Sequence, residues 1–221
     1  GRGQGSEARM KNIVAMVSGG GTNLQAIFDA IDRGEIDGQV TMVISSARKA
    51  YALERARMRG IPTLALPLKA FKTPEECQQA RHDALVKANP DLIVLAGYLG
   101  ILGEKTIRAF KGRILNIHPA LIPSFCGKGM YGHHVHEAAL KYGVKLSGAT
   151  VHFVSEDIDA GPIVFQGSVP VMDNDTPDSL AARILPVEHE LLPRAVALFC
   201  QDRIKIDGRS VSILPPQEET E

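Results

Sequence analysis

The strongest constraint on the fold is a regular alternation of short apolar segments and helical patterns in the first half of the chain. Four segments have the length and composition of strands: 12–17, 40–44, 63–66 and 91–96. The last of them, DLIVLA, is apolar without alternation, which is typical of a strand buried on both faces. Between them lie helical patterns from Leu24 to near Gly34, over 50–59, and from Pro74 toward Ala88. This order predicts an α/β fold: a Rossmann-like, mostly parallel twisted sheet with helices on both faces.

The second half changes character. After a strand at 114–117, the segments 147–154 and 162–171 read as an antiparallel hairpin. A helix follows over 177–201, which we expect Pro186 and Pro193 to break or kink. The segments 203–206 and 211–214 around Asp207-Gly208 predict a second hairpin. Because no linker interrupts this order, we expect one domain over 10–214, preceded by an expression remnant or disordered extension (1–9) and followed by a disordered tail (215–221).

Composition excludes several classes of protein. The chain has 25 basic and 25 acidic residues, so no overall positive field attracts nucleic acid, and an anionic ligand needs a local site. The three cysteines form no CxxC pair, which argues against a disulfide framework and against a cysteine zinc site. No apolar stretch is long enough to span a membrane. We therefore expect a cytoplasmic protein with small-molecule partners and no nucleic-acid or membrane partner.

A glycine loop, Ser18-Gly-Gly-Gly-Thr-Asn23, lies between the first predicted strand and helix. Free N–H groups at a helix start, with glycines that let a ligand approach, form an anion site that is usually occupied by phosphate. The alternative is a tight turn with Thr22 or Asn23 as the helix N-cap. Because three consecutive glycines exceed what a turn requires, phosphate binding is favoured.

The identity of the phosphate ligand is narrowed by the neighbouring residues. A Walker A loop is excluded, since no Gly-Lys-Ser/Thr follows. An NAD site is disfavoured, because the second strand ends without an acidic residue for the ribose. NADP stays open, since a 2′-phosphate fits the side chains at that strand end, Ser45, Ser46 and Arg48.

Asn116 and His118 flank Ile117 at the end of a predicted strand, so their side chains point to the same side. An amide donor beside an imidazole suits a carbonyl reaction, with Asn116 stabilising an oxyanion and His118 moving a proton. The alternative is a histidine that only caps the strand. Asp157 and Asp159 lie in a later loop, where acidic residues are usually solvated. If this loop folds over His118, one of the two carboxylates can hold the imidazole. The residue pattern alone does not choose between the two aspartates.

His133, His134 and His136, with Glu137, resemble a metal cluster in spacing. Because no distant further ligand is evident, we favour a polar helix start and expect no metal.

Three segments in this order and spacing, VSGGGTNLQAI, LNIHPALIPSF and TVHFVSEDIDAGPI, resemble the phosphoribosylglycinamide formyltransferases, folate-dependent enzymes of purine biosynthesis. The resemblance covers the chain from Met10 to about Leu214. It implies transfer of a formyl group from the co-substrate 10-formyltetrahydrofolate to the amine of N1-(5-phospho-D-ribosyl)glycinamide, without a metal or a covalent enzyme intermediate. The oligomeric state, monomer or homodimer, stays open.

The resemblance also implies roles for particular residues. Asn116 donates to the formyl oxygen, His118 is the general acid and base, and the family aspartate falls on Asp159, where it stabilises protonated His118. The nucleotide phosphate and ribonucleotide fall on Gly21, Thr22, Asn23 and Glu188. The folate falls on Leu99, Gly100, Ile101, Leu102, the loop 155–160 and Asn116.

Two positions depart from the pattern. Some members carry arginine where this chain has Gly100, and arginine or lysine where it has Pro74. These family positions hold the folate tail, and Lys72 is the nearby candidate for that role in this chain. The glycine-rich segment 128–132 is longer than in some members, and we expect it to gate the site.

Three other functions remain as alternatives to formyl transfer: a 10-formyltetrahydrofolate hydrolase on the same scaffold, a non-enzymatic nucleotide-binding protein, and an NADP reductase.

Overall fold

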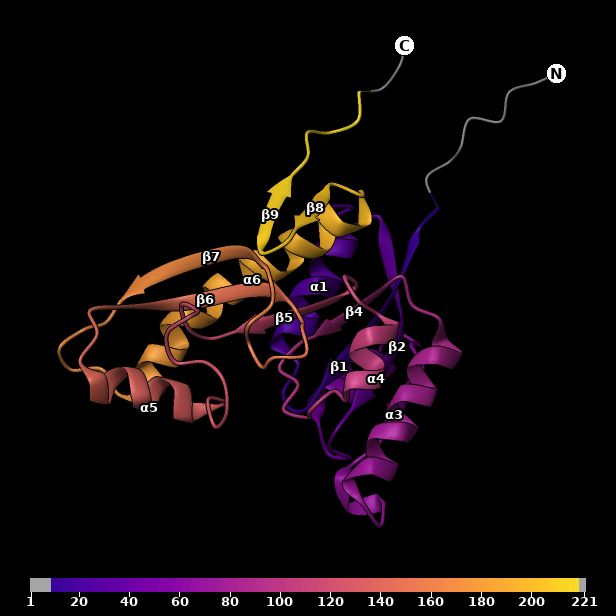
Figure 1. Ribbon diagram of the computed structural model, residues 1–221, viewed down its shortest axis with the longest axis horizontal. Coiled ribbons are helices and arrows are strands. Elements are labelled where there is room, and N and C mark those ends of the chain that lie inside the picture. Colours follow the sequence, from indigo (N-terminus) through magenta and orange to yellow (C-terminus); the bar gives the residue numbers. More distant parts are fainter. Residues whose placement is uncertain (1–8, 219–221) are drawn as a thin grey trace.

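The computed structural model describes residues 9–218. Its main element is a seven-stranded sheet in the order β3-β2-β1-β4-β5-β6-β7 (Figure 1). The strands are β1 Lys11–Val17, β2 Gly38–Ser45, β3 Thr63–Ala65, β4 Leu92–Leu95, β5 Ile114–His118, β6 Leu146–Phe153 and β7 Ile163–Pro170. The first five pair in parallel, whereas β6 is antiparallel to both β5 and β7. The predicted mostly parallel sheet and the β6–β7 hairpin are therefore confirmed.

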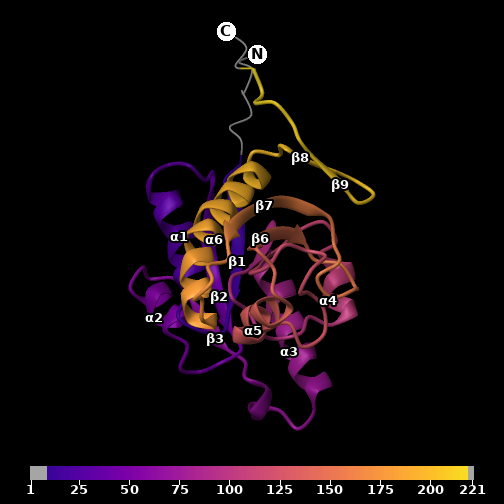
Figure 2. The same cartoon turned by 90° about the vertical axis from the view of Figure 1, so that its left-hand side faces the viewer.

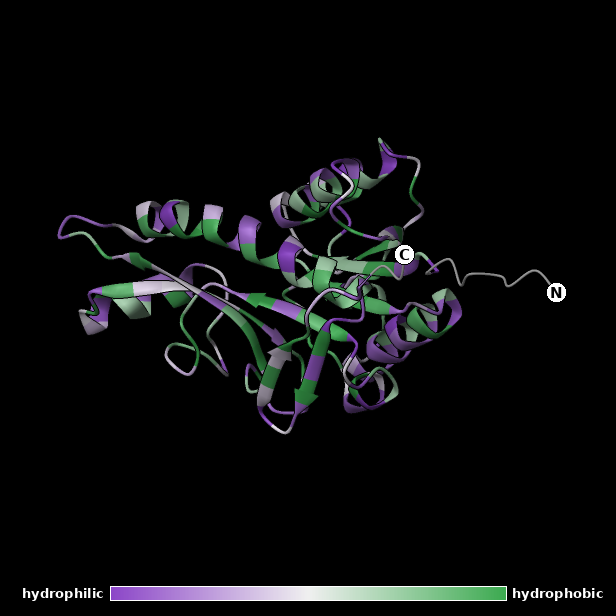
Figure 3. Ribbon diagram, turned by 90° about the horizontal axis from the view of Figure 1, so that it is seen from above, coloured by the Kyte–Doolittle hydropathy of each residue, from purple (hydrophilic) through white to green (hydrophobic). Residues whose placement is uncertain are grey.

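Helices cover both faces of this sheet. They are α1 Thr22–Asp32, α2 Tyr51–Arg57, α3 Pro74–Ala88, α4 Glu104–Ala109, α5 His133–Tyr142 and α6 Pro177–Cys200, with a short 3-10 turn at Leu68–Ala70. In Figure 2, α1, α2 and α6 lie on one side of the sheet and α3 and α4 on the other. The helices carry alternating apolar and polar segments, as amphipathic helices do (Figure 3).

Each face of the sheet has its own apolar core, because alternate strand residues point in opposite directions. On β1, Ile13, Ala15 and Val17 pack with α1, α2 and α6. Val14 and Met16 pack on the opposite face, with Leu85 of α3 and Phe110 at the end of α4. Burial on both faces explains why the central strands read as continuous apolar runs.

The last helix differs from the expectation. The helix α6 is continuous from Pro177 to Cys200 although it contains Pro186 and Pro193, so the prolines do not break it, and the alternative expectation of a kink stays a prediction. The two prolines remove two helical hydrogen bonds, but the buried face of α6 packs against α1 and the strands and holds the helix together. Its start carries a capping box between Thr176 and Ser179.

The chain ends in the predicted second hairpin, β8 Ile204–Asp207 and β9 Ser210–Ile213, with Gly208 at φ +60° in the turn. Residues 215–218 form neither helix nor strand. The rest of the predicted tail and residues 1–8 of the predicted extension lie outside the described residues, and Arg9 forms an ion pair with Asp91. Among residues 9–218, none of the helices combines the length and apolar character needed to cross a bilayer.

Gly21 provides a test of how the first loop is built. It is the N-cap of α1 at φ +78°, and a Cβ there would lie 2.6 Å from Cβ of Ala52. We expect Gly21→Ala to lower the free energy of unfolding by at least about 1 kcal/mol, because it adds both a left-handed alanine and a clash with α2. Urea titration measures this.

The matched control is Gly19→Ala. A Cβ at Gly19 meets nothing within 4 Å, so the control should change stability by less than about 0.5 kcal/mol. Equal losses in the two variants would contradict this account of the loop.

Candidate active site

The glycine loop joins β1 to α1 and is tied to α2. The Gly19 carbonyl accepts from the Ala52 N–H at 3.0 Å, and the Gly20 carbonyl accepts from Nε of Arg55 at 2.8 Å. Of the three glycines, only Gly21 is required by backbone conformation and packing, since Cβ atoms at Gly19 and Gly20 would meet nothing within 4 Å. The loop therefore has open space at Gly19 and Gly20, next to the start of α1, which is compatible with an anion site.

The alternative assignment of the helix N-cap is wrong. Gly21 is the N-cap, and Thr22 and Asn23 belong to the first turn. Asn23 is buried, and its amide Nδ2 donates to Oε1 of Glu188 at 3.2 Å. This hydrogen bond joins the start of α1 to the middle of α6, so two residues that the resemblance assigned to the ribonucleotide are in contact.

The loops after β1, β2 and β4 meet at the edge of the sheet. The Ser18 hydroxyl accepts from the N–H of Leu99 at 2.8 Å and lies 2.5 Å from the Ser46 hydroxyl. The Ser45 hydroxyl donates to the carbonyl of Ala47 at 2.7 Å. Because both strand-end serines are engaged within the protein, the structure lends no support to an NADP 2′-phosphate site there.

The segment 99–102 presents apolar side chains beside this edge. Leu99 is 60% exposed and Ile101 is 66% exposed, whereas Leu102 packs against the core of the α3 face. Gly100 is explained by its neighbour, because a Cβ at this position would lie 2.3 Å from the hydroxyl oxygen of Tyr98. That hydroxyl is buried without a hydrogen-bond partner, and burial raises the pKa of Tyr98 to about 12. An arginine at position 100 is therefore incompatible with this placement of Tyr98.

The two other positions discussed for the folate tail lie at the start of α3. Pro74 is the first residue of this helix. Lys72 is exposed, and its backbone N–H donates to Glu76. The role of Lys72 stays a prediction.

Asn116 and His118 share the sheet face that carries α3 and α4, as predicted, while Leu115 and Ile117 pack into the opposite core. On this face Ile114 still packs with Phe110 at the end of α4, but the buried residues that follow on β5 and β6 include the polar His118, Thr150 and His152. The cross-strand partners of Asn116 and His118 are His152 and Thr150. The arrangement is a cluster of polar side chains at the carboxyl end of β5.

His118 is almost fully buried, with 4% exposure, and both ring nitrogens face the protein. Its Nε2 lies 2.8 Å from the carbonyl oxygen of Phe125. Because a carbonyl only accepts, Nε2 carries a hydrogen. Its Nδ1 lies 3.7 Å from Oδ2 of Asp159. A second proton, on Nδ1, turns this contact into an ion pair.

Asp159, and not Asp157, is the carboxylate beside the histidine. Its backbone is left-handed at φ +52°, and its Oδ2 accepts from the Gly127 N–H at 3.1 Å. The carboxylate thus connects β5 to the segment 126–132. Asp157 is exposed, and its carbonyl accepts from the Ser155 hydroxyl. The geometry separates two aspartates that the residue pattern left equivalent.

The helix α5 begins at His133, which confirms the predicted polar helix start. Its three histidines have different neighbours: His133 faces Asp178 at 3.5 Å, His134 faces Glu137 at 3.7 Å, and His136 is buried. Within residues 9–218 no three His, Cys, Asp or Glu side chains are grouped closely enough to hold a metal ion.

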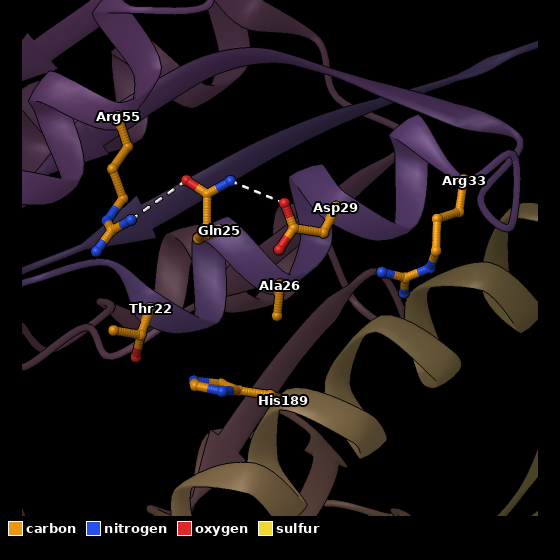
Figure 4. Close-up of a pocket in the computed structure, with 7 residues that line it drawn as sticks. All are labelled: Thr22, Gln25, Ala26, Asp29, Arg33, Arg55 and His189. Carbon is orange, nitrogen blue, oxygen red and sulfur yellow. Dashed lines mark hydrogen bonds between the residues drawn. The ribbon is translucent and has the colours of Figure 1, made fainter.

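A hollow of about 330 Å³ lies along the outer side of α1. Figure 4 shows His189 of α6 extending toward Thr22 and Ala26, while Arg55, Gln25 and Asp29 form a hydrogen-bonded chain on the other side. The hollow adjoins the glycine loop through Thr22 but contains none of the polar cluster on β5 and β6.

Sequence reasoning missed two contributors to the polar cluster. His152 contacts both Asn116 and Asp159, and the Phe125 carbonyl contacts His118. The alternation in Thr150-Val151-His152 carries the signal for His152, because two polar residues two positions apart in a buried strand share one face. A backbone carbonyl carries no sequence signal.

The fold and this cluster define a class: a Rossmann-like domain with a buried polar cluster of histidine, asparagine and aspartate at the carboxyl edge of the parallel strands. The family model described as formyl transferase matches residues 11–196, so the chain belongs to the formyl transferase family. It is 42% identical over 205 residues to the chloroplastic phosphoribosylglycinamide formyltransferase of Arabidopsis thaliana, covering 92% of this chain and 70% of the relative. It is 38% identical over 210 residues to the Escherichia coli phosphoribosylglycinamide formyltransferase, covering 93% of this chain and 97% of the relative.

Solved structures agree with this assignment. The glycinamide ribonucleotide transformylase 1 of Symbiobacterium toebii superposes with a TM-score of 0.88 at 42% identity, covering 95% of this chain and 96% of that one. A formyltetrahydrofolate deformylase of Pseudomonas syringae superposes with a TM-score of 0.85 at 27% identity, covering 94% of this chain and 67% of that one.

Glu188 provides a prediction for pH-dependent stability. Burial raises the pKa of this carboxyl, and the hydrogen bond from Asn23 offsets part of the effect. A carboxyl with a raised folded pKa holds its proton more tightly in the folded state, so stability falls as pH rises from the ordinary glutamate range through the raised pKa. We expect Glu188→Gln to have a higher thermal midpoint than the wild type at about pH 7, with the difference shrinking toward about pH 4.

Glu190→Gln, on the exposed side of the same helix, is the matched control and should show no such pH-dependent difference. If the difference in thermal midpoint between Glu188→Gln and the wild type is constant across pH, burial of the charged carboxylate does not destabilise the fold and the prediction is contradicted.

Proposed function

We propose that this chain transfers the formyl group of 10-formyltetrahydrofolate to the amine of N1-(5-phospho-D-ribosyl)glycinamide. The observation that carries the proposal is the convergence of Asn116, His118 and Asp159 on one sheet face, close to an open glycine loop at a helix start. In the sheet, Met16 pairs with Leu95 and Leu95 with Asn116. Two strand spacings amount to about 10 Å, so one ribonucleotide can reach from the loop to the cluster.

The proposed chemistry assigns one task to each of the three side chains. The substrate amine attacks the formyl carbon, and the carbonyl oxygen becomes an oxyanion that accepts from the Asn116 amide. The bond between the formyl carbon and the folate nitrogen then breaks, and the bond between the formyl carbon and the substrate nitrogen is kept. His118 takes a proton from the attacking amine and returns one to the departing folate nitrogen. Asp159 favours the positively charged imidazole in between.

The position of His118 implies a movement during the reaction. Its Nε2 is held by the Phe125 carbonyl and its Nδ1 faces Asp159. A nitrogen that moves substrate protons has to face the substrate, so the proposal includes displacement of the Phe125 carbonyl when substrate binds. Three glycines that follow Phe125 have positive φ, so the chain there suits a gate that moves the Phe125 carbonyl: Gly127, Gly129 and Gly132.

Substrate binding follows from the neighbouring elements. The N–H groups of Gly21, Thr22 and Asn23 bind the phosphate, supported by the dipole of α1, and Glu188 contacts the ribonucleotide. Leu99, Gly100, Ile101 and Leu102, together with Asn116, hold the folate, for which the exposed Leu99 and Ile101 offer apolar surface. The folate is a co-substrate in this proposal and no metal takes part. Cytoplasmic location and a monomeric or homodimeric state stay predictions.

The direct test of the reaction is an assay of the purified protein with both substrates, following the folate product. Formyl transfer that depends on the ribonucleotide amine supports the proposal. The likeness to the formyltetrahydrofolate deformylase favours hydrolysis as the second candidate. Release of formate at the same rate without the amine would establish hydrolysis and overturn transfer.

The roles within the cluster are tested by His118→Ala and Asp159→Asn. Since a positioned general acid–base group contributes about 10²–10⁴-fold, we expect kcat to fall by that order in His118→Ala and clearly in Asp159→Asn. The KM values should change little, because neither side chain is assigned to ground-state binding. Steady-state kinetics with both substrates measures the two quantities.

The matched controls come from nearby exposed positions. Asp157→Asn, in the same loop, and His134→Ala, at the start of α5, should keep kcat within about twofold of the wild type. Near-normal rates in His118→Ala or Asp159→Asn would remove that residue from its role. A loss in Asp157→Asn as large as in Asp159→Asn would remove the distinction between the two aspartates.

A further inference from the structure

His152 is a buried histidine to which neither the sequence analysis nor the proposed reaction gives a task. It lies on β6, with 2% exposure, opposite Asn116 of β5. Its Nε2 is 3.0 Å from Nδ2 of Asn116, and its Nδ1 is 3.0 Å from the carbonyl oxygen of Phe153. Both ring nitrogens of His152 therefore have a partner within the protein. One of these partners is the Asn116 amide, which is proposed to bind the oxyanion.

The two partners determine the tautomer of His152. The Phe153 carbonyl can only accept, so Nδ1 carries the hydrogen. In a neutral ring Nε2 is then an acceptor, and the Asn116 Nδ2, which carries two hydrogens, donates to it. The reverse amide orientation would place the Asn116 oxygen against the Nε2 lone pair, with no hydrogen between them. Neutral His152 thus selects one of the two amide orientations of Asn116.

From this geometry we infer that His152 is a positioning residue that orients the Asn116 amide, so that its second N–H is directed at the developing oxyanion. This inference rests on the proposed function for its catalytic consequence. The hydrogen bond to His152 uses one Nδ2 hydrogen of Asn116 and leaves the other for the substrate. A flipped amide would present its carbonyl oxygen there, which repels an oxyanion.

The charges around His152 act in opposite directions. The titratable side chains that face it are Asp159, whose Oδ1 lies 3.7 Å from Nε2, and His118 of β5. The negative charge of Asp159 favours a protonated ring, while burial and His118 oppose it. Burial is the largest effect, and it lowers the pKa of His152 below its ordinary value. Burial therefore favours the neutral ring that this orienting role requires.

Two substitutions separate the role of each ring nitrogen. The side chain of His152→Asn can donate to the Phe153 carbonyl as Nδ1 does, but it places no acceptor at the position of Nε2. His152→Gln is longer and can place its amide oxygen there. Because removing one oxyanion donor costs about 10²–10³-fold in kcat, we expect loss of its orientation in His152→Asn to lower kcat about 10–100-fold, with both KM values nearly unchanged. His152→Gln should recover most of this loss.

A role confined to folding would give a different pattern. His82→Asn is the control, because His82 is also buried and bonds through Nδ1, in its case to Thr106, between α3 and α4 and not within the polar cluster. It should keep wild-type kcat even where its thermal midpoint falls. Equal kcat in His152→Asn and the wild type, or no recovery in a folded His152→Gln, would overturn the inference.

A measurement without catalysis keeps this inference distinguishable from the proposed function. ¹⁵N NMR of histidine-labelled wild-type protein should show His152 neutral at about pH 7, with the hydrogen on Nδ1. A hydrogen on Nε2, or a charged ring, would overturn the orienting role whether or not the enzyme transfers formyl groups. If the wild type shows the expected tautomer but transfers no formyl group, the proposed function fails instead.

Discussion

At the carboxyl end of β5, buried polar side chains replace an apolar core on a single face of the sheet, and the candidate site depends on this replacement. Buried polar groups destabilise a fold unless they are hydrogen-bonded. Here Thr150 donates to the Ala120 carbonyl and accepts from the Ile122 N–H, and His118 bonds to Phe125. The chain after β5 therefore folds back over the sheet, because the polar face supplies its hydrogen-bonding partners.

The backbone near this face is held in conformations that are uncommon for residues with side chains. Phe125 and Asp159 both have positive φ, at 48° and 52°, and both contact His118. Such conformations cost of the order of 1–3 kcal/mol each and persist when the surroundings determine them. The ion pair of Arg108 with Glu156, and the hydrogen bond of Arg209 with the Ala160 carbonyl, fasten the loop around Asp159 from α4 and from the β8–β9 turn. The site is thus assembled from segments far apart in the chain.

The sheet and most of its helices could be predicted from the sequence, because the information is local. Apolar runs and the proline at the start of α3 mark the elements without reference to distant residues. The short helix α4 was not foreseen, since its six residues carry too little periodicity. That α6 runs unbroken through Pro186 and Pro193 was not predictable from the residues, because tertiary packing outweighs two missing hydrogen bonds.

The candidate site divides in the same way. Asn116 and His118 were predictable as a pair from strand periodicity alone. The choice of Asp159 over Asp157 was not, because it depends on the path of a loop whose residues are all compatible with solvent. His152 went unassigned because its contacts to Asn116 and Asp159 exist only after β5 and β6 pair.

We propose that one substrate lies across β1, β4 and β5, with its phosphate anchored at one end and formyl transfer at the other. A crystal structure with the ribonucleotide and an unreactive folate analogue is the most direct test. We expect the phosphate on the N–H groups of Gly21 to Asn23 and the substrate amine beside His118, with the folate nitrogen on the same sheet face as Asn116. A phosphate bound away from the start of α1, or reacting atoms beyond reach of both Asn116 and His118, would contradict it.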